Sequence, residues 1–168
     1  LSQTIGGYVQ NEWQSDALNL VIGARLDKNN LIDHVIVSPR ANVRYTPIKN
    51  LILRAGYTSG YRAPQAYDED LHVMAVGGEA SLIVLDPELR PEYSHSVTAS
   101  ADMYATAGKV QFNVLVEGFY TSLNDVFTLV EQHADAAGNQ VLMRTNADRA
   151  EVRGVNIEAK AALDANNS

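Results

Sequence analysis

The feature that most constrains the fold is an alternation of apolar and polar side chains, repeated in segment after segment of the sequence. In residues 51–61, the odd positions are mostly leucine, alanine and tyrosine, and the even positions are mostly arginine, glycine and threonine. The same pattern returns in residues 92–104 and 110–121. Because successive side chains of a strand point to opposite faces, this period predicts strands with one apolar and one polar face. The chain is therefore predicted to be an all-β protein.

The alternation predicts an antiparallel up-and-down meander of about seven strands. The last two predicted strands are too long to be uniform, and we expect them to bend, for example near Asn124-Asp125. Between the fourth and fifth lies a long segment, residues 62–91, that shows no comparable pattern. The predicted strands cover residues 4–14, 18–27, 34–46, 51–61, 92–104, 109–131 and 141–163.

The connections between these strands alternate between short and long. Short turns follow the first, third and fifth strands, and longer loops follow the second, fourth and sixth, so each kind collects at one end of the sheet. Outer-membrane barrels have this asymmetry, with short periplasmic turns and long extracellular loops. Tyrosines near the strand ends also fit the aromatic girdles of such barrels. The pattern thus favours part of a transmembrane β-barrel, and the alternative is a soluble all-β binding module.

Composition excludes several other classes. The chain has 168 residues, with 20 acidic and 13 basic side chains and a net charge of −7, which disfavours nucleic acid as a partner. Without cysteine, it has no disulfides, no thiolate zinc site and no cysteine nucleophile. No nucleotide-binding loop or hydrolase motif is present. Asp68, Asp70 and His72 are close enough in sequence to suggest a barrel enzyme, but an acidic, solvated loop explains them better, so we predict no enzymatic activity.

A series of short motifs lies along the chain, mostly at the ends of the predicted strands. The motifs are Gly23-Ala24-Arg25-Leu26-Asp27, Ser38-Pro39-Arg40-Ala41, Gly56-Tyr57-Thr58-Ser59-Gly60-Tyr61-Arg62-Ala63-Pro64, Leu85-Asp86-Pro87-Glu88-Leu89-Arg90-Pro91-Glu92, and Thr145-Asn146-Ala147-Asp148-Arg149-Ala150 with Gly154-Val155-Asn156-Ile157-Glu158. In residue type and order they resemble the motifs of TonB-dependent outer-membrane receptors. Two of the motifs depart from that family's pattern: Asp86 and Arg90 stand where asparagine and lysine are usual, and Asn156 stands where glutamate is usual.

This resemblance implies a barrel of about 22 strands around an N-terminal plug. Residues 1–168 would be a partial barrel segment that lacks the plug, the remaining strands and the C-terminal strand, with residues 62–91 as a long extracellular loop. The location implied is the outer membrane of a Gram-negative bacterium, where the barrel contacts lipid. The missing plug would couple import to the TonB–ExbB–ExbD energy-transducing complex.

The cargo implied by the resemblance is a scarce nutrient, most often a ferric siderophore, taken up by active transport. Haem and cobalamin are the alternatives within the same family. Haem receptors of this type place a histidine ligand between the two motifs that flank the long loop, and His72 lies there; neutral imidazole is a proper axial ligand of haem iron. No resident cofactor is predicted, and the residues that would bind a metal are unknown.

The candidate site residues form two sets. Those expected to contact cargo are Tyr61, Arg62, Tyr67 and His72. Those expected to point into the lumen are Arg40, Arg44, Arg54, Glu117 and Glu158. We expect the three lumen arginines to pair with carboxylates of the plug, or with Glu117 and Glu158, more than with cargo.

Overall fold

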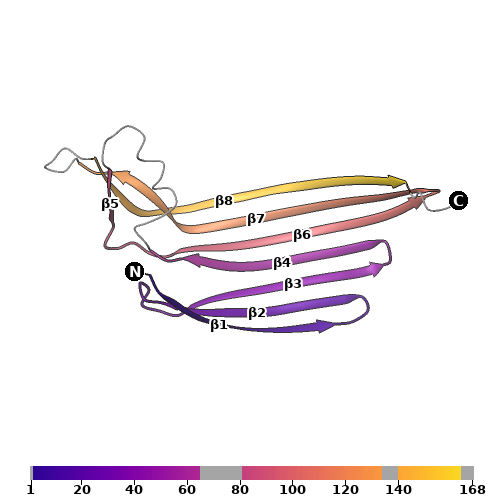
Figure 1. Ribbon diagram of the computed structural model, residues 1–168, viewed down its shortest axis with the longest axis horizontal. Helices are drawn as coiled ribbons and strands as arrows, with labels where there is room; N and C mark the ends of the chain where they lie inside the picture. Colours follow the sequence, from indigo (N-terminus) through magenta and orange to yellow (C-terminus); the bar gives the residue numbers. More distant parts are fainter. Residues whose placement is uncertain (1, 65–80, 134–139, 164–168) are drawn as a thin grey trace.

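The computed structural model describes residues 2–64, 81–133 and 140–163. Its eight strands form one sheet in the order β1-β2-β3-β4-β6-β7-β8-β5 (Figure 1). In this described part of the chain, β1 pairs only with β2, so the sheet is open. The strands are β1 (Thr4–Gln14), β2 (Leu18–Asn29), β3 (Ile36–Ile48), β4 (Leu51–Arg62), β5 (Ser81–Leu85), β6 (Glu92–Ala107), β7 (Val110–Glu131) and β8 (Gln140–Leu163).

All neighbouring strands from β1 to β8, leaving β5 aside, pair antiparallel, which confirms the predicted meander. The short turns lie at one end of the sheet, called here the turn end; the other is the loop end (Figure 1). The turn between β6 and β7 has two residues, Gly108 and Lys109, and Gly108 has a φ of 61°. A glycine with positive φ at the first turn position is typical of a type II′ hairpin, whose twist matches that of the strands.

Strand β5 is an element that the alternation did not predict. It lies within the long segment 62–91 and pairs in parallel with the start of β8, from Ser81 opposite Gln140 to Leu85 opposite Arg144. The sequence carries a signal for it in the run Leu82-Ile83-Val84-Leu85, because a short continuous apolar run is typical of a buried strand. The long connection therefore returns to the sheet and adds to its edge.

Strands β7 and β8 extend beyond the other strands at the loop end and curve there (Figure 1). Asp125, where a bend was expected, has a φ of 55° and does not take part in the pairing between the two strands. Aspartate tolerates this left-handed conformation better than most residues. Pairing resumes at Val126 opposite Ala147, so each strand continues past the interruption.

The register gives the sheet two chemically different faces. The polar face carries the even-numbered residues of β3, β4 and β6, such as Arg40, Arg54 and Ser100, and the apolar face carries the odd-numbered ones, such as Leu53 and Ala101. Among the described residues, only three hydrophobic side chains are buried: Ile32, Ile36 and Leu142. Within those residues, no helix is long and apolar enough to cross a membrane.

Candidate functional site

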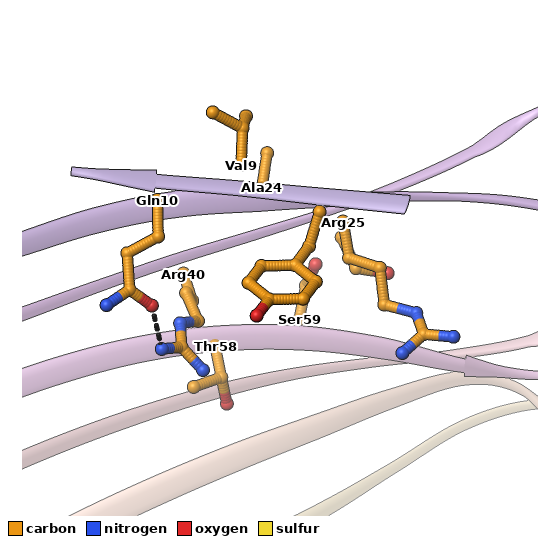
Figure 2. Close-up of a pocket in the computed structure, with 9 residues that line it drawn as sticks. Val9, Gln10, Ala24, Arg25, Arg40, Thr58 and Ser59 are labelled. Carbon is orange, nitrogen blue, oxygen red and sulfur yellow. Dashed lines mark hydrogen bonds between the residues drawn. The ribbon is translucent and has the colours of Figure 1, made fainter. Parts of the chain in front are cut away.

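The polar face is hollowed over β1 to β4 by a cavity of about 790 Å³. Arg40 donates a hydrogen bond to the Gln10 side chain across β2, while Val9 and Ala24 point to the opposite face (Figure 2). Arg40 thus meets a neutral amide, and no carboxylate of the described residues pairs with it. The side chains of the polar face that line the cavity belong to Tyr8, Gln10, Arg25, Ser38, Arg40 and Thr58.

At the loop end of this cavity, Arg25 and Asp27 form an ion pair with Nε and Oδ2 2.7 Å apart. Asp27 is only 3% exposed, whereas the Arg25 side chain is 59% exposed. Gly6 lies opposite Asp27 in the register, and a Cβ on it would stand 1.9 Å from Asp27 Oδ1. The glycine therefore makes room for the carboxylate, which holds the guanidinium beside the cavity. This contact joins two residues of the Gly-x-Arg-x-Asp motif.

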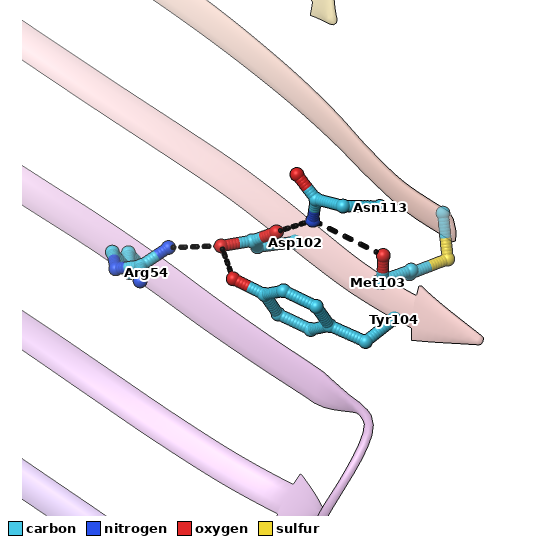
Figure 3. Close-up of polar contacts among 5 residues, drawn as sticks. All are labelled: Arg54, Asp102, Met103, Tyr104 and Asn113. Carbon is cyan, nitrogen blue, oxygen red and sulfur yellow. Dashed lines mark hydrogen bonds and ion pairs between the residues drawn. The ribbon is translucent and has the colours of Figure 1, made fainter. Parts of the chain in front are cut away.

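Arg54, predicted to face the lumen, lies on the polar face and interacts with a carboxylate that the sequence did not single out. Its Nη1 is 3.4 Å from Asp102 Oδ2, and Asp102 is 8% exposed (Figure 3). Tyr104 donates its hydroxyl to the same carboxylate at 2.9 Å, and Asn113 donates its amide at 2.5 Å. Three donors around one buried carboxylate make this cluster a structural tie between β4, β6 and β7 near the turn end.

The other predicted lumen residues also lie on the polar face. Glu158 pairs with Lys160 at 2.7 Å, and Glu117 accepts a hydrogen bond from Asn156 at 3.3 Å. In the described part of the chain, Arg44 makes no ion pair, although it lines a smaller hollow that Arg54 and Glu117 also line. Among the described residues, none of the three lumen arginines pairs with Glu117 or Glu158: Arg54 contacts Asp102, and Glu158 contacts Lys160. Pairing with carboxylates of the plug stays a prediction.

A second cluster lies at the loop end, where the long segment leaves β4. The Arg62 guanidinium lies 4.7 Å from the centre of the Phe127 ring, and that of Arg144 lies 6.0 Å from it. Both distances are within the range of cation–π attraction. Glu92, opposite Arg62 in the register, accepts a hydrogen bond from the Phe127 backbone N–H at 3.0 Å. Arg62 thus packs against β7 at the mouth of the polar face.

Two of the sequence motifs meet beside this cluster, one through Arg90 and the other through Asn146. Its side-chain oxygen accepts from the Arg90 backbone N–H at 2.8 Å, and its amide donates to the Arg90 carbonyl at 2.9 Å and the Asp125 carbonyl at 2.6 Å. Arg90 also pairs with the Asp125 carboxylate at 2.7 Å. These contacts between Asn146, Arg90 and Asp125, called here the loop latch, fix the end of the long segment to β7 and β8.

Asp86, which precedes Arg90 in the chain, attaches the same segment to β8. Its carboxylate accepts hydrogen bonds from the Glu88 backbone N–H and the Thr145 hydroxyl, each at 2.9 Å. The two donors favour the charged form and lower the pKa of Asp86 from its ordinary value of 3.8. An asparagine, usual in the family resembled, can also accept the bond from the Glu88 N–H, although without the added strength that the charge of a carboxylate gives. The departure from the motif therefore preserves the local geometry.

The predicted cargo contacts are placed only in part. Tyr61 and Arg62 both line a hollow of about 480 Å³ at the loop end, although the register puts Tyr61 opposite Tyr93 on the apolar face. Tyr67 and His72 lie outside the described residues. The described residues hold no group of three or more histidine or acidic side chains suited to a metal. Phe127 and Asn146 were not predicted as site residues. They lie beside Arg62 and Arg90 only because strands far apart in the sequence pair with one another.

The chain matches the family described as TonB dependent receptor-like, beta-barrel, over residues 2–168. Among solved structures, the siderophore receptor PirA from Pseudomonas aeruginosa aligns with a TM-score of 0.76 and 18% identity, over 93% of this chain and 30% of that one. The hemophore receptor HasR from Serratia marcescens aligns with a TM-score of 0.72 and 13% identity, over 96% and 32%.

The FrpB iron transporter from Neisseria meningitidis aligns with a TM-score of 0.66 and 17% identity, over 94% of this chain and 23% of that one. Among curated protein sequences, none matches this chain. Identities this low show a shared fold alone. The chain spans about 30% of the length of the PirA structure.

Proposed function

Since the chain belongs to the family of TonB-dependent receptor β-barrels, we propose that it forms part of the wall of an outer-membrane importer of ferric siderophores in a Gram-negative bacterium. The family match over residues 2–168 carries this proposal, because it covers nearly the whole chain. The polar face is then the lumen wall, and the apolar face contacts lipid. The soluble binding module considered from the sequence loses its support.

In this proposal, residues 1–168 are one barrel segment, and 62–91 is an extracellular loop tied to the barrel by the loop latch. The plug and the other strands belong to the rest of the receptor, since the chain spans about 30% of the PirA structure. Import is powered by the TonB–ExbB–ExbD complex acting on the plug. The protein itself performs no chemistry on the cargo: its contribution is binding that differs between the states of the plug.

The cargo is proposed to enter at the loop end and to meet Tyr61, Arg62, Tyr67 and His72. Arg25 and Arg40 lie further along the wall, on the cavity of the polar face. Guanidinium groups bind carboxylate and other anionic oxygens well, which suits an anionic ferric siderophore. A haem receptor is the second candidate, because the hemophore receptor HasR shares the fold and His72 offers an iron ligand.

Iron uptake by the full-length receptor tests the proposal. The receptor is expressed in a bacterial strain that lacks its own siderophore receptors, and radioactive iron is supplied as a catecholate siderophore, as a hydroxamate siderophore or as haem. We expect uptake from at least one siderophore, and we expect it to disappear when TonB is deleted. Uptake from haem alone would make the protein a haem receptor, and uptake from none of the three would contradict the proposal.

A further inference from the structure

The apolar face carries a shallow groove of about 410 Å³ over β6, β7 and β8. Two neighbouring rows of the register form it. One row holds Val97, Tyr120 and Arg153, and the next holds Ala99, Gly118 and Val155. Phe119 and Gly154, which pair with each other between these two rows, also line the groove, although their side-chain positions belong to the opposite face. The groove thus joins an apolar floor to one cationic and one phenolic side chain.

The groove is open because its floor is made of small residues. A Cβ added to Gly118 would meet no atom within 4 Å, so the space above the glycine is empty. Ala99 adds only a methyl group beside it, and Val155 stands at its edge with 67% of its surface exposed. A strand disfavours glycine in its interior, so Gly118 costs β7 some stability while it opens the groove.

Charge is unevenly distributed at the end of the groove nearer the loop end. Arg149 is compensated, because it pairs with Glu151 at 2.8 Å and donates to the Tyr120 hydroxyl at 2.8 Å. Arg153, between Glu151 and Val155 on the same face, makes no ion pair or hydrogen bond in the part of the chain that the structure describes. From Val155 towards the turn end, this face of β8 carries only apolar side chains. Arg153 therefore marks the boundary between polar and apolar surface.

We propose that this groove binds a phosphate-bearing lipid of the outer leaflet, with its phosphate on Arg153 and an acyl chain along Ala99, Gly118 and Val155. The inference rests on the proposed membrane location. A guanidinium forms paired hydrogen bonds with phosphate oxygens, and the Tyr120 ring suits the interface between headgroups and chains. A free phosphate ion would leave the apolar floor uncovered, and a neutral lipid would leave Arg153 uncompensated.

Native mass spectrometry of the full-length receptor in detergent, titrated with diphosphoryl lipid A, tests this inference. We expect Arg153→Gln and Gly118→Val each to weaken lipid A binding at least tenfold. Arg153→Lys, which keeps the charge but cannot form the paired hydrogen bonds, should weaken binding by about threefold, less than Arg153→Gln. Gly7→Val is the matched control, since Gly7 also lies on the apolar face with nothing within 4 Å of its added Cβ. Inorganic phosphate at millimolar concentration should not displace the lipid.

Unchanged binding in both Arg153→Gln and Gly118→Val would overturn the inference, as would an equal loss in Gly7→Val or displacement by inorganic phosphate. Refolding into lipid vesicles, read by resistance to protease, is measured for every variant. It separates loss of the groove from loss of the fold, since Gly118→Val replaces a strand glycine by a good strand former. A wild-type receptor that failed to insert into vesicles would instead contradict the proposed function.

Discussion

At the scale of single residues, the glycines of the motifs are explained by what a side chain would meet. A Cβ on Gly23 would stand 2.9 Å from the backbone oxygen of Val9, on the adjacent strand. We expect Gly23→Ala to lower the free energy of unfolding by about 1–3 kcal/mol, because a backbone atom cannot move aside without spreading β1 from β2. Denaturant titration of the receptor in lipid bilayers measures this. Gly7→Ala, at an open position of β1, should change it by no more than about 0.5 kcal/mol.

Asp86 gives a second prediction at this scale, because its motif normally has asparagine. Its folded pKa lies below its ordinary value of 3.8, so the attachment it provides is complete above about pH 4 and is lost as the pH falls through the lower, folded value. The Glu88 amide resonance of the ¹⁵N-glutamate-labelled receptor in detergent reports this change. We expect the chemical shift of this amide to change with pH with a midpoint below 3.8. In Asp86→Asn, the change caused by the Asp86 carboxylate should be absent. A midpoint at or above 3.8 would contradict the assignment.

At the scale of elements, the loop latch makes the end of segment 62–91 part of the β7–β8 ribbon. Asn146→Ala would leave one N–H and two carbonyl groups without their partner, at a cost of about 1–3 kcal/mol where they stay dry. We expect the Arg90 amide to exchange its hydrogen at least tenfold faster, measured by mass spectrometry on the receptor. Asn156→Ala is the control in the same strand, since that amide makes one long contact, to Glu117. Equal exchange in the two variants would show that the latch does not hold the segment.

The elements also show what alternation along the chain can and cannot predict. The antiparallel strands and their faces follow from it, because a hairpin joins neighbours in sequence and the period of two then assigns each side chain to a face. Strand β5 was missed, because its parallel pairing with β8 joins residues 59 positions apart. The Asp102 cluster and the loop latch were missed for the same reason: Arg54 and Asp102, or Arg90 and Asn146, are adjacent only through pairing of distant segments.

At the scale of the whole molecule, the apolar face must match the thickness of a membrane if it contacts lipid. On β7, the side chains of that face are apolar from Val110 to Gly118, and Tyr120 follows. The ten residue steps from Val110 to Tyr120 correspond to about 34 Å of strand. A tilt of about 40° reduces this to about 26 Å of height, close to the ~25 Å apolar belt of outer-membrane barrels. In the proposed placement, Val114 lies near the middle of the membrane.

This placement predicts that the same substitution lowers the free energy of unfolding by very different amounts at two adjacent positions. Val114→Arg should cost about 2–4 kcal/mol of folding free energy in a bilayer, because the charge would face the acyl chains near the midplane. Leu115→Arg should cost far less. Leu115 lies on the polar face between Asp102 and Glu158, which pair with it across the strands on either side and would receive the guanidinium.

Leu115 is a better control than Asn113, whose amide already donates to Asp102 and to the Met103 carbonyl. Denaturant titration of each variant in bilayers gives the two free energies, and the amount of receptor in isolated outer membranes gives an independent measure. Equal losses at the two positions would mean that neither face contacts lipid as assigned. A larger loss at Leu115 would reverse the two faces, and the lumen, the lipid groove and the cargo path would have to be exchanged with them.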